Sequence, residues 1–213
     1  MPWILLGTII SYLLGSIPTA YLAGKAIKGV DIRKFGSGNV GATNALRVLG
    51  PGAGITVLII DILKGLLSVV FVSDLVLSKT VLLDAGFIRV LDGFCCILGH
   101  NWTVFLKFKG GKGVATTIGV LLGLALRLAG LKVIFGLVIL TWLAAFLISR
   151  IVSAASILAA ITIPIYMLIF KSSGYLVASG TVISVFIIVR HASNIKRILL
   201  GKEPRFHFKK SAG

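Results

Sequence analysis

The sequence predicts an all-α integral membrane protein with seven transmembrane helices, and its composition and hydrophobic pattern support this fold class. Of the 213 residues, 57% are apolar, and the mean hydropathy is +1.06, whereas soluble domains are roughly 45–50% apolar. The apolar residues also gather in stretches of about 20, the length of helix that crosses the hydrocarbon core of a bilayer. A single polytopic domain covering residues 1–213 is the expected organisation.

Seven apolar stretches are expected to form the spans. They are residues 3–23, 54–72, 81–99, 113–131, 132–149, 152–170 and 175–189. Three charged residues interrupt the third stretch, and a very short connection separates the fourth from the fifth. Five spans are therefore the alternative count, with the weaker stretches re-entrant or lying at the membrane interface.

Basic residues are distributed unevenly between the two predicted sides of the membrane. The chain has 22 Lys and Arg against 6 Asp and Glu, and 16 of the 22 fall in the loops after the first, third and fifth spans and in the tail. Because basic loops favour the cytoplasmic side, the N-terminus is expected outside and the C-terminus in the cytoplasm. The cytoplasmic segments are then residues 25–52, 100–113 and 190–213. Part of the basic excess is this topology signal; the remainder favours an anionic lipid or substrate, and we expect no nucleic acid partner.

The first cytoplasmic segment contains the glycine-rich string GSGNVGATN at residues 36–44, followed by Arg47. Glycines such as Gly38 let a ligand approach the backbone, whose N–H groups can surround an anion. Ser37 adds a neutral donor, and Arg47 can form paired hydrogen bonds with phosphate oxygens. A flexible surface connection uses the same residue types, but their combination within a dozen positions favours a binding site.

The second segment reads GHNW at residues 99–102 and KFKGGKGVATT at residues 107–117. It differs from a nucleotide-binding P-loop, because Lys112 is followed by Gly113 where Ser or Thr is required, and no strand precedes it. Gly110, Gly111 and Gly113 surround Lys112 at the start of an apolar helix, where N–H groups and the helix dipole attract anions. Lys112 is therefore predicted to bind substrate, whereas Lys107 is equally consistent with a lysine that attracts anionic lipid.

The third segment includes His191 and Asn194, which share one face if the last helix continues through them. Histidine titrates near neutrality, and asparagine supplies a neutral polar partner. Glu203 is expected to pair with a nearby Lys or Arg, and His207 in the tail is given no role.

Charges inside the predicted spans are costly and are therefore candidates for function. Asp61 and Lys64 are three residues apart, so a structural ion pair is expected, with a supporting role near the site as the alternative. The same pairing is expected of Arg89 and Asp92. The adjacent cysteines at positions 95 and 96 are expected to be small buried side chains, and no metal-ligand spacing is present.

Taken together, the three motifs resemble the bacterial acyl-phosphate:glycerol-3-phosphate acyltransferase family of the PlsY type. The matching segments are GSGNVGATNALR (36–47), GHNWTVFLKFKGGKGVAT (99–116) and HASNIKRILLGKE (191–203). The resemblance implies transfer of a fatty acyl group from acyl-phosphate to the 1-hydroxyl of sn-glycerol 3-phosphate. The products would be lysophosphatidic acid and inorganic phosphate, at the first step of bacterial phospholipid synthesis. It also implies seven helices in the bacterial inner (plasma) membrane, an active site on the cytoplasmic side, and no metal, CoA or other cofactor.

The resemblance also implies which residues act. The family's functional positions fall on Ser37, Arg47, Lys112, His191 and Asn194. We expect a catalytic set and a substrate-binding set: Ser37, His191 and Asn194 in the first, and Arg47, Lys112, Asn194, Ser37, Gly38, Gly110, Gly111 and Gly113 in the second. The base that accepts the hydroxyl proton is either His191 or a substrate phosphate oxygen. A covalent intermediate on Ser37 is disfavoured, because no base is identifiable beside it.

Two other functions remain open from the residues alone: a transporter or channel for organic phosphates, and a CoA-dependent membrane acyltransferase. The spans have no continuous polar stripe, which disfavours transport. The His-x4-Asp motif of CoA-dependent glycerolipid acyltransferases is missing, since Phe105 follows His100 and Lys196 follows His191 at that spacing. No carboxylate is therefore expected beside either histidine. The expected partners are glycerol 3-phosphate, a long-chain acyl-phosphate and membrane lipid, and the lability of acyl-phosphate favours association with the enzyme that produces it.

Overall fold

The computed structural model describes residues 1–80 and 84–206, and every regular element within these ranges is helical. The predicted all-α class is therefore confirmed. The chain divides into two compact units, Met1–Leu131 and Lys132–Gly213. The predicted motifs at residues 36–47 and 99–116 belong to the first unit, and the third motif belongs to the second.

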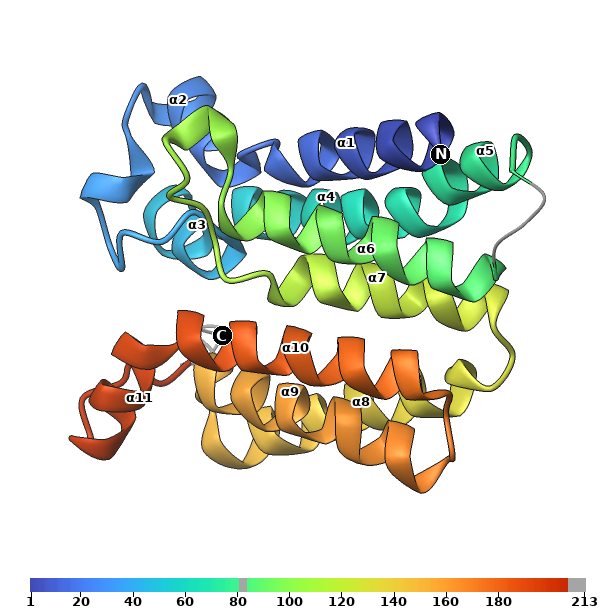
Figure 1. The fold of residues 1–213 in the computed structure, drawn as a ribbon. Coiled ribbons are helices and arrows are strands. Elements are labelled where there is room, and N and C mark those ends of the chain that lie inside the picture. Colours follow the sequence, from blue (N-terminus) through green and yellow to red (C-terminus); the bar gives the residue numbers. More distant parts are fainter. Residues whose placement is uncertain (81–83, 207–213) are drawn as a thin grey trace. The chain divides into compact units, whose positions relative to one another are not determined.

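The first unit is built on α1 (Pro2–Ser16), α4 (Pro51–Leu67), α6 (Ala85–Asn101) and α7 (Val114–Arg127). α1 packs against α6, and α4 packs against α7; Figure 1 shows these helices running alongside one another. The remaining elements of this unit are α2 (Thr19–Lys28), η1 (Ile32–Lys34), α3 (Ala42–Leu49), the π-helical turn η2 (Ser68–Val72), α5 (Ser73–Leu77) and η3 (Val104–Leu106). In Figure 1, α2 and α3 lie at one end of the helices and α5 lies at the other.

Glycines bring the paired helices into backbone contact. A Cβ on Gly15 of α1 would overlap the Cys96 carbonyl of α6, and a Cβ on Gly99 of α6 would overlap the Tyr12 carbonyl of α1. Gly119 of α7 lies equally close to the backbone of α4. Such small-residue contacts are a principal means of packing helices in a membrane, where apolar lipid gives helices little hydrophobic reason to associate.

The first predicted span is broken near its C-terminal end. Pro18 separates α1 from α2, because proline lacks a backbone N–H and restricts the residue before it. The break exposes carbonyl groups that other elements use. The Thr103 hydroxyl donates to the Ser16 carbonyl oxygen at 2.5 Å, and Lys64 Nζ donates to the Ile17 carbonyl oxygen at 3.2 Å. The break is thereby attached to both α4 and the residues after α6.

The expected pairing of Arg89 with Asp92 is wrong. Arg89 instead donates to Asp74 at 2.5 Å, and Arg127 pairs with the other oxygen of the same carboxylate. Asp92 accepts a hydrogen bond from the Ser73 hydroxyl at 2.9 Å. Side chains on a helix lean toward its N-terminus, which directs Arg89 toward α5 and away from Asp92, one turn further along the helix.

The second unit contains α8 (Leu131–Ser149), α9 (Val152–Ile169), α10 (Gly174–Arg190) and the short α11 (Ala192–Leu199). α9 packs against α10, and α11 contacts both. Within the described residues, each of the seven predicted stretches contains a helix, although residues 81–83 of the third stretch lie outside them.

Helix length and hydropathy identify fewer spans than the sequence pattern. Within the part of the chain that the structure describes, four segments are long and apolar enough to cross a membrane: Pro2–Lys28, Pro51–Leu77, Leu131–Ser149 and Val152–Ile169. The bent pair α10 and α11 brings the count to five if it is one span. α7 has only 14 residues and reaches about 21 Å at 1.5 Å per residue, less than the roughly 30 Å of a hydrocarbon core.

Candidate active site

A buried amide holds the first glycine-rich loop in place. Asn44, on the first turn of α3, is fully buried. Its Oδ1 accepts a hydrogen bond from the Ser37 backbone N–H at 2.8 Å, and its Nδ2 donates to the carbonyl oxygens of Ile32 at 3.2 Å and Phe35 at 3.1 Å. A Cβ on Gly36 would overlap this amide. The buried Asn44 amide therefore links the backbone on both sides of the loop.

The predicted binding residues of this loop are accessible. The Ser37 and Arg47 side chains are exposed, and Gly38 is half-buried. Gly38 has a φ of 70°, a conformation that residues with a Cβ rarely adopt. The buried Asn44 side chain thus links the loop that carries the Ser37 hydroxyl to the helix that carries the Arg47 guanidinium.

The second glycine-rich turn is fastened to the C-terminal end of α6. The Gly110 N–H donates to the Asn101 carbonyl oxygen at 3.2 Å, and the Gly111 N–H donates to the His100 carbonyl oxygen at 2.9 Å. A Cβ on Gly110 would overlap the His100 carbonyl oxygen, and a Cβ on Gly111 would overlap the His100 imidazole. Gly113 has a φ of 78° and lies against the Asn101 side chain. Each of the three glycines predicted to bind substrate is therefore also required by the packing of this turn.

The lysines of this segment differ in their surroundings. Lys112 is half-buried, whereas Lys107 and Lys109 are exposed. Lys112 lies directly before Gly113, which is the residue that precedes the first turn of α7. A cation held there, where the helix dipole also favours negative charge, suits a phosphate group better than the two exposed lysines do.

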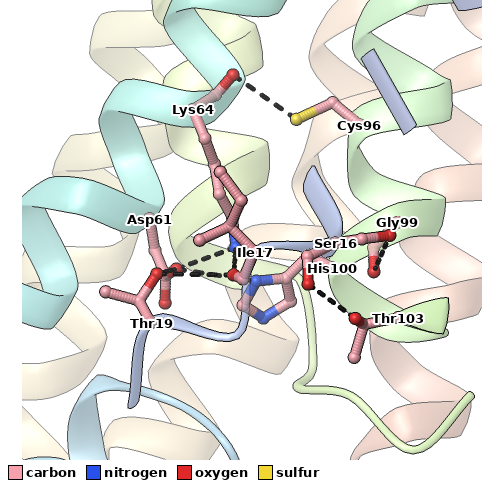
Figure 2. Close-up of polar contacts among 9 residues, drawn as sticks. All are labelled: Ser16, Ile17, Thr19, Asp61, Lys64, Cys96, Gly99, His100 and Thr103. Carbon is pink, nitrogen blue, oxygen red and sulfur yellow. Dashed lines mark hydrogen bonds and ion pairs between the residues drawn. The ribbon is translucent and has the colours of Figure 1, made fainter. Parts of the chain in front are cut away.

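A buried charge cluster lies next to this turn (Figure 2). Lys64 Nζ forms an ion pair with Asp61 Oδ1 at 2.9 Å, and both side chains are less than 5% exposed. Asp61 Oδ1 also accepts a hydrogen bond from the Thr19 hydroxyl at 3.0 Å, while Lys64 donates to the Ile17 carbonyl oxygen. The predicted ion pair is confirmed, and its contacts show that it joins α4 to the break between α1 and α2.

The sequence did not predict a carboxylate beside His100, and the structure contains one. Asp61 Oδ1 lies 3.8 Å from His100 Nδ1, because α4 and α6 bring together residues 39 positions apart, which a motif of fixed spacing does not detect. The usable signal was that Asp61 and Lys64 are charged residues inside a predicted apolar span, and that His100 directly follows another such span.

These elements border a small polar hollow. Its lining comes from the α1–α2 break, the first loop, α4 and the second glycine turn: Gly15, Ser16, Ile17, Pro18, Thr19, Val40, Lys64, His100, Thr103, Gly110 and Gly111. Val40 and the glycine pair show that the first two predicted loops border the same hollow.

The third motif does not continue the preceding helix. α10 ends at Arg190, and α11 begins at Ala192 after a bend of 60°. His191 lies at the junction, where its Nδ1 is 2.7 Å from the Ile187 carbonyl oxygen. Because a carbonyl oxygen only accepts, Nδ1 carries a proton in this contact. His191 and Asn194 are both buried, but the expectation of one straight helical face is wrong.

A single carboxylate organises the third motif. Glu203 accepts hydrogen bonds from Asn194 Nδ2 at 2.6 Å, Arg197 Nε at 2.6 Å and the Ser153 hydroxyl at 2.8 Å. The predicted pairing of Glu203 with a basic residue is therefore confirmed. Burial alone raises the pKa of Glu203, but the three hydrogen bonds and the Arg197 charge outweigh it and hold the pKa below its usual range. Glu203 thereby fixes the orientation of the Asn194 amide.

The structure thus assembles the predicted residues in two groups. The first unit holds the loop and helix that carry Ser37, Gly38 and Arg47, and the turn that carries Lys112. The second unit holds His191 and Asn194 in a separate set of contacts. Among residues 1–80 and 84–206, no group of three His, Cys, Asp or Glu side chains is placed to hold a metal ion.

Comparison with known proteins identifies the family. The family model described as "Glycerol-3-phosphate acyltransferase" matches residues 5–201. The chain is 43% identical to the glycerol-3-phosphate acyltransferase of Synechococcus sp. (strain CC9902) over 196 residues, which cover 92% of each chain. It is 42% identical to the enzyme of the same name from Gloeobacter violaceus over 200 residues, covering 92% of this chain and 91% of the relative.

Two solved structures share the fold. One is a crystal structure of PlsY (YgiH), an integral membrane glycerol 3-phosphate acyltransferase, in its glycerol 3-phosphate form. It matches with a TM-score of 0.81 and 36% identity over 96% of both chains. The lysophosphatidic acid form of PlsY (YgiH) matches with a TM-score of 0.80 at the same identity, covering 96% of this chain and 95% of that one.

Proposed function

Because the chain belongs to the glycerol-3-phosphate acyltransferase family, we propose that it transfers a fatty acyl group from acyl-phosphate to the 1-hydroxyl of sn-glycerol 3-phosphate. The products are lysophosphatidic acid and inorganic phosphate, and the reaction is the first step of bacterial phospholipid synthesis. The structural relatives in glycerol 3-phosphate and lysophosphatidic acid forms support the acceptor and the product.

The proposed topology has seven transmembrane helices in a bacterial inner membrane, with the N-terminus outside and the C-terminus in the cytoplasm. The distribution of basic residues supports this orientation, since 16 of 22 fall on one predicted side. Under this topology α7 is a short span, and all three motifs face the cytoplasm. Glycerol 3-phosphate then enters from water, and the acyl chain enters from the adjacent leaflet.

The second glycine turn is the observation that carries the proposed function. Gly110 and Gly111 line the polar hollow, and half-buried Lys112 follows that pair directly and lies just before α7. A cation held beside a helix N-terminus suits phosphate, because it needs little reorganisation when charge develops. We propose that Arg47 and Lys112 of the first unit bind the phosphate of glycerol 3-phosphate, and that Gly38, Gly110, Gly111 and Gly113 leave room for it because they carry no side chain. We propose separately that Asn194 of the second unit binds substrate.

The proposed donor is an acyl-phosphate, and the reaction is independent of CoA. The acceptor hydroxyl oxygen forms a bond to the acyl carbon, the bond from that carbon to the phosphate oxygen breaks, and inorganic phosphate leaves. Phosphate is already a good leaving group, so positioning and charge neutralisation supply most of the acceleration. We propose that Ser37 and neighbouring backbone N–H groups bind the donor phosphate.

Two groups can accept the hydroxyl proton. One is His191, whose Nδ1 proton faces the Ile187 carbonyl oxygen, so that the lone pair of the neutral ring lies on Nε2. The other is a substrate phosphate oxygen, which needs no protein base. Near-normal turnover of His191→Ala at saturating substrate selects the phosphate, whereas a loss of about 100-fold or more in kcat selects the histidine.

A donor comparison tests the proposed function. The purified protein, in detergent or lipid, receives labelled glycerol 3-phosphate with either an acyl-phosphate or the matching acyl-CoA. The proposal predicts lysophosphatidic acid from acyl-phosphate alone, with one phosphate released per product. Product from acyl-CoA alone would establish the CoA-dependent alternative. Absence of product with both donors would contradict both enzyme functions and favour a transporter of organic phosphates.

A further inference from the structure

The imidazole of His100 lies between the buried ion pair and the second glycine turn. Its Nδ1 is 3.8 Å from Asp61 Oδ1, and its Nε2 is the atom that a Cβ on Gly111 would overlap first. The side chain is 7% exposed and lines the polar hollow. The two ring nitrogens therefore face two different elements, α4 on one side and the glycine turn on the other.

The Asp61 side of this arrangement is held rigidly. Asp61 is bound by Lys64 at 2.9 Å and by the Thr19 hydroxyl at 3.0 Å, and Lys64 is bound in turn to the Ile17 carbonyl oxygen. Figure 2 shows these groups around the His100 ring. A buried ion pair contributes little net stability compared with apolar residues of similar volume. Its presence beside a lining residue of the hollow therefore calls for a role other than packing two apolar helices.

A side chain at position 111 would meet the His100 ring first. Gly111 is not among the residues with positive φ, so its backbone conformation accommodates a side chain. The three atoms nearest to a Cβ at this position are Nε2, Cδ2 and Cε1 of His100. Gly111 rests directly on the imidazole, and Lys112 is the next residue of the chain.

We propose that His100 is a positioning residue for acyl transfer. Its ring, backed by the Asp61–Lys64 pair, holds the Gly110–Gly113 turn in place and thereby sets the position of Lys112 against the phosphate of glycerol 3-phosphate. This inference rests on the proposed function, in which Lys112 binds that phosphate. His100 touches the turn and not the reacting atoms, so its loss weakens acceptor binding more than it slows the chemical step.

The test compares His100→Asn, Gly111→Ala and the double variant in the full-length protein. Asparagine keeps a polar group near Asp61 but is too short to support Gly111. Each single change is expected to raise the KM for glycerol 3-phosphate about 10-fold, with kcat changed less than about threefold and the KM for acyl-phosphate unchanged. Alanine at position 111 fits the space that His100→Asn opens, so the double variant is expected within about twofold of His100→Asn alone.

Two further variants separate positioning from general destabilisation. His100→Gln reaches the former place of Nε2 and is expected to recover most of the acceptor affinity. Cys96→Ala, one helical turn before His100, removes a buried side chain that contacts the Lys64 carbonyl oxygen at 3.4 Å and does not line the hollow. It is expected to leave both KM values unchanged.

The proposal is overturned if His100→Asn keeps the wild-type KM for glycerol 3-phosphate, or if the two single changes multiply in the double variant. It is also overturned if His100→Gln behaves as His100→Asn does. If His100→Asn does not fold, Gly111→Ala decides: an unchanged KM at an unfolding temperature within about 3 °C of the wild type overturns the proposal. Failure of the proposed function is recognised separately, because the wild-type protein would then form no lysophosphatidic acid.

Discussion

The two glycine-rich loops of the first unit are fixed by opposite means. In the first loop, one side chain, Asn44, makes three hydrogen bonds to the backbone around it. In the second, the backbone of Gly110 and Gly111 bonds to carbonyl groups at the end of α6, and His100 fills the space below. The first loop is therefore fixed by the Asn44 side chain. The second loop requires Gly110 and Gly111, because a side chain at either position would overlap His100.

Because of this difference, the two loops are expected to be sensitive to different substitutions, although their sequences contain the same residue types. Glycine, hydroxyl, amide and cationic residues occur in each, yet the residue that fixes the first loop is an amide facing away from solvent. Substitution of Asn44 is expected to free the first loop, whereas replacement of a glycine by alanine is expected to displace the second loop. The predictions below separate the two cases.

Asn44→Ala is expected to have the largest effect. It removes three hydrogen bonds and leaves buried backbone groups unpaired, which costs about 2–4 kcal/mol of unfolding free energy. We expect kcat/KM to fall about 100-fold as the first loop loses its shape. Asn44→Asp, which keeps the shape but directs a second acceptor at two carbonyl oxygens, is expected to be no better. Steady-state kinetics with wild-type values for either variant would show that the clamp is dispensable.

Gly113→Ala is expected to have an intermediate effect. The new Cβ lies 2.7 Å from Asn101 Oδ1 at a φ of 78°, so both sterics and backbone conformation oppose it. We expect the KM for glycerol 3-phosphate to rise about 10-fold. Gly136→Ala in α8 is the matched control, since its Cβ meets open space and the change favours the helix by about 1 kcal/mol. Equal KM values in the two variants would contradict the role assigned to the second turn.

The third motif resembles the first loop, because one side chain, that of Glu203, accepts hydrogen bonds from three other side chains. Its folded pKa lies below the ordinary value. The carboxylate therefore stabilises the fold above the ordinary Glu pKa of about 4.3, and this contribution is lost as pH falls through the folded pKa. Glu203→Gln is expected to lower the unfolding temperature by about 3 °C at pH 7. The difference from wild type should shrink when thermal unfolding is measured near pH 4, and a constant difference would contradict this account.

Lys107→Gln is expected to have the smallest effect. Lys107 is exposed, so losing its charge is expected to change the KM for glycerol 3-phosphate less than about twofold. Weaker binding to vesicles of anionic lipid is compatible with this expectation, because Lys107 then serves the membrane surface. An increase in KM as large as that of Gly113→Ala would mean that the turn binds substrate through its exposed lysines.

Much of the fold was predictable from local pattern. Helices occur in all seven apolar stretches because hydrophobic length is a property of contiguous residues. The break at Pro18 and the bend at His191 were not predicted, since each lies inside or beside an apolar run whose average hydropathy hides it. Likewise, the partner of Arg89 depends on where α5 lies, which residue spacing within α6 does not reveal.

The candidate site was predictable only in part for the same reason. Ser37, Arg47 and Lys112 could be picked out because hydroxyl or cationic side chains lie next to several glycines in short segments of the sequence. His100 and Asp61 are 39 residues apart in the chain, and their side chains come close together only because α4 and α6 belong to one packed unit. Asn44 was visible in the first motif, but its burial, which distinguishes a structural amide from a ligand-binding one, is a property of the fold.

The central claim is that the half-buried cation of the second turn binds the acceptor phosphate, and the KM for glycerol 3-phosphate of Lys112→Gln tests it most directly. Loss of one charge-assisted contact to phosphate is expected to raise this KM about 100-fold while leaving the KM for acyl-phosphate within about twofold. An unchanged KM for glycerol 3-phosphate, or an equal rise in both KM values, would contradict it.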